Sequence, residues 1–428
     1  MFGLRKILTF HALAVVLSAC SATGPGSGTY HGAAVLPAPA MAPVAPEAAI
    51  AAPIVQAPPP IARAAPQAGV VTAGDVDDTL NLTDFQRYQA AAARDLDLPA
   101  AKLQRPVLAR LRRPGGVPAP GIRVTLRRPG ADNAFYEGYS GVDGVVTVFP
   151  EALGQDRLII VELRAFSTDG ADPVVTQLRT GSPRQSVDLP FAGTWSPDFL
   201  DLVFAVDTTG SMQDELDWLA QEIRQITRNV RQSAPGVDIR LGLIVYKAPA
   251  DPYVVRSYGF TRNPREFARW VRSERASGGA GGPEVVADAL TAAVDMNWRR
   301  GRGERLLFQI GDEPPTAAKT QTYYAAAARA AAEGIQVFSV AASGVDGHLE
   351  FLMRQGAAMT GGRYVFLTDD SGVGLAHAEP TISCYRVTRL NELMASILRS
   401  ELTGRRIEAA PADVIRTVGS YQNGRCLN

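Results

Sequence analysis

The pattern of apolar and polar positions changes near residue 197, and from there the chain alternates between two kinds of segment. Short apolar runs typical of buried strands lie at 201–206, 237–246, 253–260, 305–310, 336–341 and 363–366. Helical spacing of apolar residues is found at 212–230, 264–271, 283–296, 321–333, 348–359 and 390–402. This alternation predicts an α/β fold with a doubly wound, mostly parallel sheet covered by helices on both faces. In such folds, binding sites lie beyond the carboxyl ends of the strands.

The region before residue 197 has the shorter period of half-buried strands. Runs that alternate apolar and polar residues lie at 121–126, 144–149, 157–166, 174–178 and 185–189. They are separated by turn signals such as Asp143-Gly144, which predicts a small all-β sandwich over 104–192. A strand that follows an Asp-Gly turn resembles the carboxypeptidase regulatory-like domains, and we expect this part to act as a spacer or packing module. A helix is predicted at 82–96, within a short segment at 76–103.

The first residues carry the pattern of an export signal. Arg5 and Lys6 precede an apolar run at 7–16, and Leu17-Ser18-Ala19 leads to Cys20. Because the apolar run is too short to span a bilayer, we expect a signal peptide at 1–19 rather than a retained transmembrane helix. Small residues directly before a cysteine resemble the lipobox of bacterial lipoproteins, which implies cleavage before Cys20 and attachment of lipid there. An ordinary signal peptide with a cysteine at this position is the alternative.

The segment 20–75 is rich in Ala, Pro and Gly and offers few large apolar side chains to bury. It is therefore expected to form an extended, semi-rigid tether between the lipid anchor and the folded parts. Ser21 differs from the aspartate that usually retains a lipoprotein in the inner membrane of two-membrane bacteria. We therefore expect an exported protein of the cell envelope that is attached to the outer membrane. The sequence leaves open whether it lies on the periplasmic side or on the cell surface.

The chain has three cysteines, Cys20, Cys384 and Cys426. If Cys20 is lipidated, the other two remain as a pair, and a pair in an oxidising compartment usually forms a disulfide. Such a bond would fasten the C-terminal tail, 405–428, to the folded part. Two free buried thiols are the alternative.

Composition argues against several classes of function. Lys plus Arg and Asp plus Glu are both 43 among the 428 residues, so no net charge attracts the chain to nucleic acid. The sequence contains neither a Gly-x-Ser-x-Gly nucleophile elbow nor a phosphate-binding Gly-x-x-x-x-Gly-Lys loop. A Ser211–His348–Asp312 triad can be imagined, but the spacing gives it no support. We therefore expect a binding protein rather than an enzyme.

Candidate chemistry follows the first apolar run of the α/β region, in the sequence Asp207-Thr208-Thr209-Gly210-Ser211. Asp207, Thr209 and Ser211 place three hard oxygen atoms on one loop between a strand and a helix. Oxygen ligands of this kind suit Mg²⁺ or Mn²⁺. The alternative is structural, with Thr209 and Ser211 capping the following helix and Asp207 ending the strand.

This loop resembles the metal-ion-dependent adhesion site of von Willebrand factor type A domains, which begins Asp-x-Ser/Thr-x-Ser. The resemblance covers 197–402, within a domain placed at 196–404, and implies Asp312 as a further ligand because it follows an apolar strand and precedes prolines. The family often carries Gly-Gly-Gly-Asp-x-Pro-Glu before the next helix. Here Gly281 stands at the ligand position. Glu284 either compensates for the missing oxygen or has a structural role in the first helical turn.

The resemblance implies a protein-binding module of the adhesion type, in which an acidic side chain of a protein ligand completes the shell of the bound ion. The alternative is a metal-independent scaffold lipoprotein of the cell envelope. Related domains also work with an ATPase inside the cell, as in metal chelatases, but the export signal argues against that role.

Overall fold

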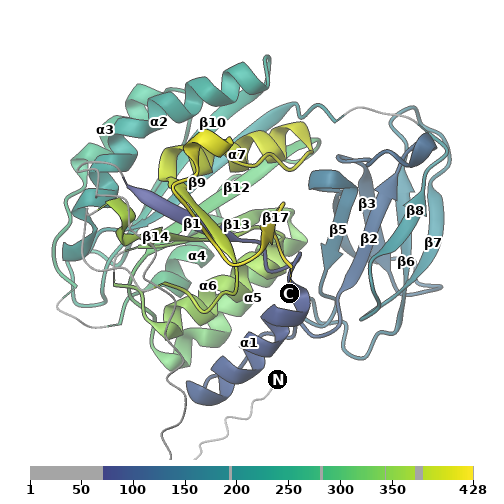
Figure 1. Cartoon of the computed structure of the whole chain (residues 1–428), viewed down its shortest axis with the longest axis horizontal. Helices are drawn as coiled ribbons and strands as arrows, with labels where there is room; N and C mark the ends of the chain where they lie inside the picture. Colours follow the sequence, from purple (N-terminus) through teal and green to yellow (C-terminus); the bar gives the residue numbers. More distant parts are fainter. Residues whose placement is uncertain (1–70, 192–194, 280–282, 343, 372–378, 428) are drawn as a thin grey trace, which may run out of the picture. The chain divides into compact units, whose positions relative to one another are not determined.

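The computed structural model describes residues 71–191, 195–279, 283–342, 344–371 and 379–427 (Figure 1). The expected signal peptide, Cys20 and nearly all of the expected tether lie outside the described residues, as does Gly281. Among the helices of the described part, none combines the length and the apolar character that a membrane span requires.

The main sheet has nine strands in the order β11-β10-β9-β12-β13-β14-β1-β15-β16. Five of them are parallel, namely β10 (Asp238–Tyr246), β9 (Phe199–Asp207), β12 (Gly303–Gly311), β13 (Gln336–Ala341) and β14 (Tyr364–Thr368). The other four join in antiparallel pairings: β11 (Val255–Thr261), β1 (Thr72–Val76), β15 (Tyr385–Arg389) and β16 (Arg416–Val418). The sheet is therefore mixed, and the expectation of a mostly parallel sheet is corrected.

Two connections explain the mixed character. The link from β10 to β11 is too short for a crossover, so β11 returns antiparallel as a hairpin. Strand β1 comes from the N-terminal segment and inserts between β14 and β15, antiparallel to both. It begins at Thr72, before the end of the segment expected to be a tether.

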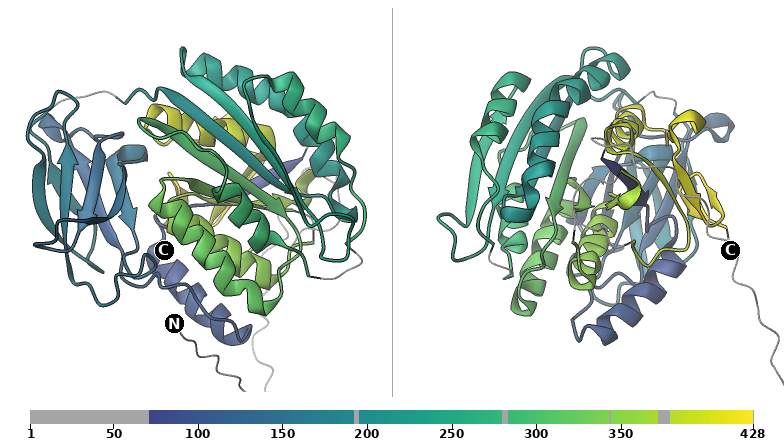
Figure 2. Two further views of the ribbon diagram at one scale, coloured as in Figure 1. Left: turned by 180° about the vertical axis from the view of Figure 1, so that it is seen from behind. Right: turned by 60° about the vertical axis from the view of Figure 1, so that its left-hand side comes forward.

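Helices cover both faces of the main sheet (Figures 1 and 2). One face packs against α2 (Gln213–Ser233), α3 (Pro264–Ser273) and α7 (Leu390–Thr403), and the other against α4 (Val286–Val294), α5 (Thr320–Ala332) and α6 (Gly347–Thr360). Leu202, Phe204 and Val206 of β9 belong to the first hydrophobic core, between the sheet and α2, α3 and α7. Val203 and Ala205 belong to the second core, between the sheet and α4, α5 and α6. Because β9 is buried on both faces, it has a continuous apolar sequence.

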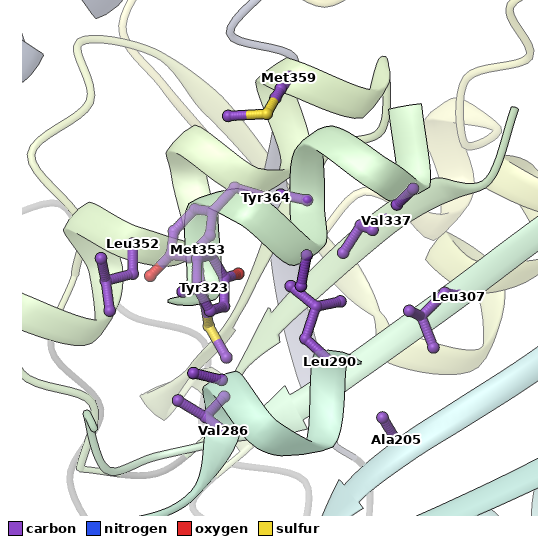
Figure 3. Packing of buried hydrophobic residues seen from close by; sticks show 14 of the residues in the cluster. Ala205, Val286, Leu290, Leu307, Tyr323, Val337, Leu352, Met353, Met359 and Tyr364 are labelled. Atoms are coloured by element: carbon purple, nitrogen blue, oxygen red, sulfur yellow. The ribbon is translucent and has the colours of Figure 1, made fainter. Parts of the chain in front are cut away.

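Figure 3 shows the second core at close range. Its labelled side chains include Val286 and Leu290 of α4, Tyr323 of α5, Leu352 and Met353 of α6, and Leu307 of β12. These residues fix α4 against the sheet, and α4 is the helix that follows the glycine-rich segment at 277–284, called the glycine-rich loop below.

Helix α1 (Leu82–Asp95) confirms the helix predicted at 82–96 and packs against α6. Arg354 of α6 donates to both carboxylate oxygens of Asp78, over 3.0 and 2.8 Å, and its guanidinium lies 3.8 Å from the ring centre of Tyr88. Both charged side chains are 3% exposed. This buried pair therefore fastens the segment between β1 and α1 to the α/β region.

Seven further strands precede β9 and form two small sheets. The first has the order β5-β2-β8, with β5 (Val145–Val148), β2 (Val107–Arg112) and β8 (Gln185–Asp188). The second has the order β4-β3-β6-β7, with β4 (Ala134–Tyr139), β3 (Arg123–Arg127), β6 (Ile160–Phe166) and β7 (Val174–Arg179). Alternate residues of both sheets share one core, and the five predicted strands are all present. Strands β2 and β4 were not expected.

The C-terminal tail is held at several places, one of which is β16, which pairs with β15 in the main sheet. It carries the short strands β17 (Tyr421–Gln422) and β18 (Arg425–Cys426). Cys426 forms the predicted disulfide with Cys384, directly before β15, with 5.4 Å between the Cα atoms. Asn81 adds a further link, since its Nδ2 donates to Gly424 O over 2.7 Å and its Oδ1 accepts from Cys426 N over 2.8 Å.

The short 3-10 helices lie in connections. They are η1 (Pro114–Gly116), η2 (Val142–Gly144), η3 (Gly210–Met212), η4 (Ala317–Lys319), η5 (Asp369–Ser371) and η6 (Pro411–Asp413). Of these, η3 directly follows the Asp207 loop and forms part of the site described next.

Candidate functional site

Three carboxylates meet beyond the carboxyl end of the parallel strands. Asp207 is the last residue of β9, Asp312 directly follows β12, and Glu284 precedes α4. One oxygen atom of each lies within 4.8 Å of the others, and the side chains are 0, 5 and 3% exposed respectively. Within the described part of the chain, this is the one group of three or more acidic, histidine or cysteine side chains close enough to share an ion.

The loop after β9 places the hydroxyl ligands expected from the sequence in the same region. The Thr209 amide donates to Asp207 Oδ1 over 2.7 Å, which turns the chain back toward the carboxylate. Thr209 is the residue before η3 but makes no side-chain capping bond. Ser211 is exposed, and its hydrogen bond to the Asp312 carboxylate favours the ionised form of that acid. The structure therefore brings Asp207, Thr209, Ser211 and Asp312 together.

Four oxygen atoms in this cluster are buried without a hydrogen-bond partner in the protein. They are Asp207 Oδ2, Thr209 Oγ1, Glu284 Oε2 and Asp312 Oδ1. A buried polar atom that forms no hydrogen bond costs free energy, so such atoms are rare in folded proteins. The four atoms are all of the hard type that Mg²⁺ and Mn²⁺ prefer. The residues present therefore fit a cation.

The sequence left two roles open for Glu284, that of a ligand that compensates for a missing oxygen and that of a structural residue. Its amide donates to Pro314 O over 3.0 Å, which joins the segment before α4 to the loop after β12. This bond brings its carboxylate beside those of Asp207 and Asp312. The position that the family resemblance marks as a ligand, Gly281, lies outside the described residues.

The glycine-rich loop approaches the Asp207 loop very closely. A Cβ atom on Gly279 would lie 2.9 Å from Thr209 Cβ, and one on Gly278 would lie 1.9 Å from Asp251 Oδ1. Both glycines have positive φ, +84° and +85° in chain order, a conformation that other residues rarely adopt. The glycines are therefore required for two loops to come together at the carboxylates.

Burial raises the pKa of each carboxyl group in the cluster. Burial raises the pKa of Asp207 to about 6, and the negative charge of Asp312 adds to this effect. The pKa of Glu284 is raised by burial and by the neighbouring Asp207 carboxyl. Burial also raises the pKa of Asp312, although its hydrogen bond with Ser211 acts in the opposite direction. Without a cation, mutual repulsion and burial keep the three carboxyl groups from all being ionised at neutral pH.

These shifts predict how the stability of the metal-free protein depends on pH. In the unfolded chain an aspartate ionises near pH 4, whereas Asp207 in the folded protein ionises near pH 6. Between these values the folded state binds more protons than the unfolded state, so the free energy of unfolding falls as the pH rises. Urea unfolding in a chelator at pH 5 and pH 7.5 measures the effect. In Asp207→Asn this contribution disappears, so the free energy of unfolding should change less between the two pH values. An equal change in the parent chain and in Asp207→Asn would show that the pH dependence does not come from Asp207.

Comparison with known proteins identifies the fold around this site. Residues 201–366 match the von Willebrand factor A domain family. The alpha-protein kinase vwkA of Dictyostelium discoideum is 31% identical over 132 residues, which is 30% of this chain and 21% of the kinase. A putative ariadne-like RING finger protein, R811, of Acanthamoeba polyphaga mimivirus is 27% identical over 116 residues, 27% of this chain and 11% of that protein. The chain therefore spans between about a tenth and a fifth of the length of these relatives.

Solved structures with low sequence identity are also similar to parts of the chain. The pilus adhesin SpaC of Lactobacillus rhamnosus GG has 13% identity and a TM-score of 0.31, covering 47% of this chain and 29% of the adhesin. The BatB protein of Bacteroides thetaiotaomicron has 16% identity and a TM-score of 0.25, covering 50% and 92% respectively. From the family match, which includes β9, α2 and the strands to β14, the chain contains a von Willebrand factor A domain at residues 201–366.

Proposed function

We propose that this domain is a protein-binding module of the adhesion type that holds a divalent cation, Mg²⁺ or Mn²⁺. Asp207, Thr209, Ser211, Asp312 and Glu284 would hold the ion. The observation that carries the proposal is the set of four buried oxygen atoms without a hydrogen-bond partner. When bound, the ion would offer a coordination position to an oxygen atom of a protein ligand, such as an acidic side chain. The proposed role is binding and not catalysis.

We also propose that the protein is exported and attached to the outer membrane through lipid on Cys20. The disulfide between Cys384 and Cys426 supports an oxidising compartment. Strands β2 to β8 would form a small packing module rather than a spacer next to the anchor, because β1, which precedes them in the chain, already lies in the main sheet. Labelling of cells with a palmitate analogue tests the anchor, since Cys20→Ser should abolish the label. Sedimentation with the inner membrane on a sucrose gradient would contradict the proposed location.

The metal site is tested by isothermal titration of the full chain, carrying Cys20→Ser for solubility, with Mn²⁺ and Mg²⁺. The full chain is needed because a fragment that begins near residue 197 would lack β1, which lies inside the main sheet. We expect saturable binding of one ion per chain. Absence of binding would favour the alternative of a metal-independent scaffold and direct the search for partners to other surfaces.

Glu284 is expected to be a ligand, so Glu284→Gln should weaken Mn²⁺ binding by about tenfold or more. The amide keeps the size of the side chain but removes one of three negative charges that attract the ion. Titration under the conditions above measures the change. Glu284 lies before the N-cap of α4, and not in its first turn as the sequence had suggested. Glu392→Gln, a substitution at an acidic residue of α7 that is not part of the carboxylate cluster, is the control. Equal affinity in Glu284→Gln and the control would mean that Glu284 has a purely structural role.

A further inference from the structure

Lys247 is a buried basic residue beside the cluster, and none of the roles described above involves it. It directly follows β10, whose last residue, Tyr246, pairs with Asp207 of β9. The side chain is 3% exposed. Its ammonium group donates to the backbone carbonyls of Thr208 and Ser277, and it approaches Arg275 O at 3.4 Å and Ser277 Oγ at 3.3 Å. Three carbonyl acceptors engage all three hydrogens of an ammonium group.

These acceptors belong to the two loops that form the site. Thr208 lies between the candidate ligands Asp207 and Thr209, and Ser277 opens the glycine-rich loop. The loops are joined by Ser277 N, which donates to Thr208 O over 3.1 Å, and by Gly210 N, which donates to Gly278 O over 3.3 Å. Lys247 adds a third connection, and it reaches both loops from a position directly after β10. Without Lys247, the carbonyl of Ser277 would lose this donor.

We infer that Lys247 is a positioning residue for the metal site, which holds the Thr208–Thr209 loop against the glycine-rich loop through its hydrogen bonds to both. The inference rests on the proposed function, because it assumes that the cluster binds a divalent ion.

The test compares four substitutions in the full chain with Cys20→Ser, by Mn²⁺ titration and by thermal unfolding without metal. Lys247→Met removes the charge and the donors, Lys247→Gln removes the charge but keeps a donor, and Lys247→Arg keeps both. Lys319→Met is the matched control, because Lys319 is a half-exposed lysine that pairs with Asp288 over 2.9 Å. We expect Lys247→Met and Lys247→Gln to bind Mn²⁺ about tenfold more weakly or worse. Lys247→Arg should stay within about threefold of the parent chain, and Lys319→Met should be unchanged.

The outcomes separate this inference from the proposed function. If the parent chain binds no Mn²⁺, the proposed metal site is wrong, and so is this inference, which depends on it. If the parent binds and the Met and Gln variants bind equally well, Lys247 does not position the site. Equal losses in the Arg, Gln and Met variants would also overturn the inference, because a side chain that restores several donors would then have no effect. If Lys247→Met does not fold, the Mn²⁺ affinities of Lys247→Arg and Lys247→Gln are compared instead. Equal affinities of these two variants would overturn the inference.

Discussion

Asp207→Asn is expected to abolish Mn²⁺ binding, with a loss of affinity of at least about a hundredfold, while the metal-free protein stays folded. The amide oxygen can still accept the hydrogen bond that Thr209 N donates over 2.7 Å. The substitution removes a negative charge that is fully buried and close to two other carboxylates. The metal-free variant should therefore be at least as stable as the parent at pH 7.5. Titration with Mn²⁺ and thermal unfolding in a chelator measure the two effects.

The opposite directions of these effects make the test specific to a binding site. A substitution that merely damaged the fold would lower stability and metal affinity together. Asp188→Asn is the control, because Asp188 is an exposed aspartate that pairs with Arg112 over 2.8 Å and lies in β8. Full Mn²⁺ affinity in Asp207→Asn would exclude the cluster as the metal site.

Reduction of the disulfide is expected to lower the free energy of unfolding by about 4 kcal/mol in the chain-entropy model. The bond joins residues 42 positions apart and so restricts a long loop of the unfolded chain. It also holds the tail where Asn81 bonds to Gly424 and Cys426, so its loss should loosen the start of α1 as well. Urea unfolding of the chain with and without a thiol reductant measures the change.

A chain with both Cys384→Ser and Cys426→Ser is the control for the reductant. It should match the reduced parent, and the reductant should leave its unfolding midpoint where it was. If the reduced parent unfolds at the same urea concentration as the oxidised parent, the bond does not stabilise the fold, and the contacts of Asn81 hold the tail without it.

The main elements and the meeting of the loops that carry Asp207 and Asp312 could be predicted from the sequence because local patterns determine them. Strand β9 is buried on both faces, so its apolar run is continuous and ends visibly at Asp207. Strand β12 ends in the same way before Asp312. Parallel neighbours end at the same edge of a sheet, so the closeness of the two aspartates follows from the order of elements.

Strand β1 could not be predicted, because its sequence, Thr-Ala-Gly-Asp-Val, lacks an apolar run. It is a strand because of its neighbours. A Cβ atom on Gly74 would lie 2.6 Å from Phe366 Cζ, and Asp75 pairs with Arg363 over 3.2 Å, both across long sequence distances. The role of Glu284 depends in the same way on a bond to Pro314, thirty positions further on. No periodicity within a short window records such contacts.

The insertion of β1 has a mechanical consequence. If the protein is anchored at Cys20 as proposed, any pull between the membrane and a bound partner reaches the domain at residue 71 and enters the middle of the main sheet rather than its edge. Thr72 to Val76 pair with Thr368 to Tyr364 on one side, and Thr72 to Gly74 pair with Arg389 to Val387 on the other. A pull along the strand loads the hydrogen bonds of these residue pairs together in shear. They must therefore break almost at the same time instead of one after another. The proposed tether would therefore join the domain at an interior strand, which resists such a load better than an edge strand paired on one side only.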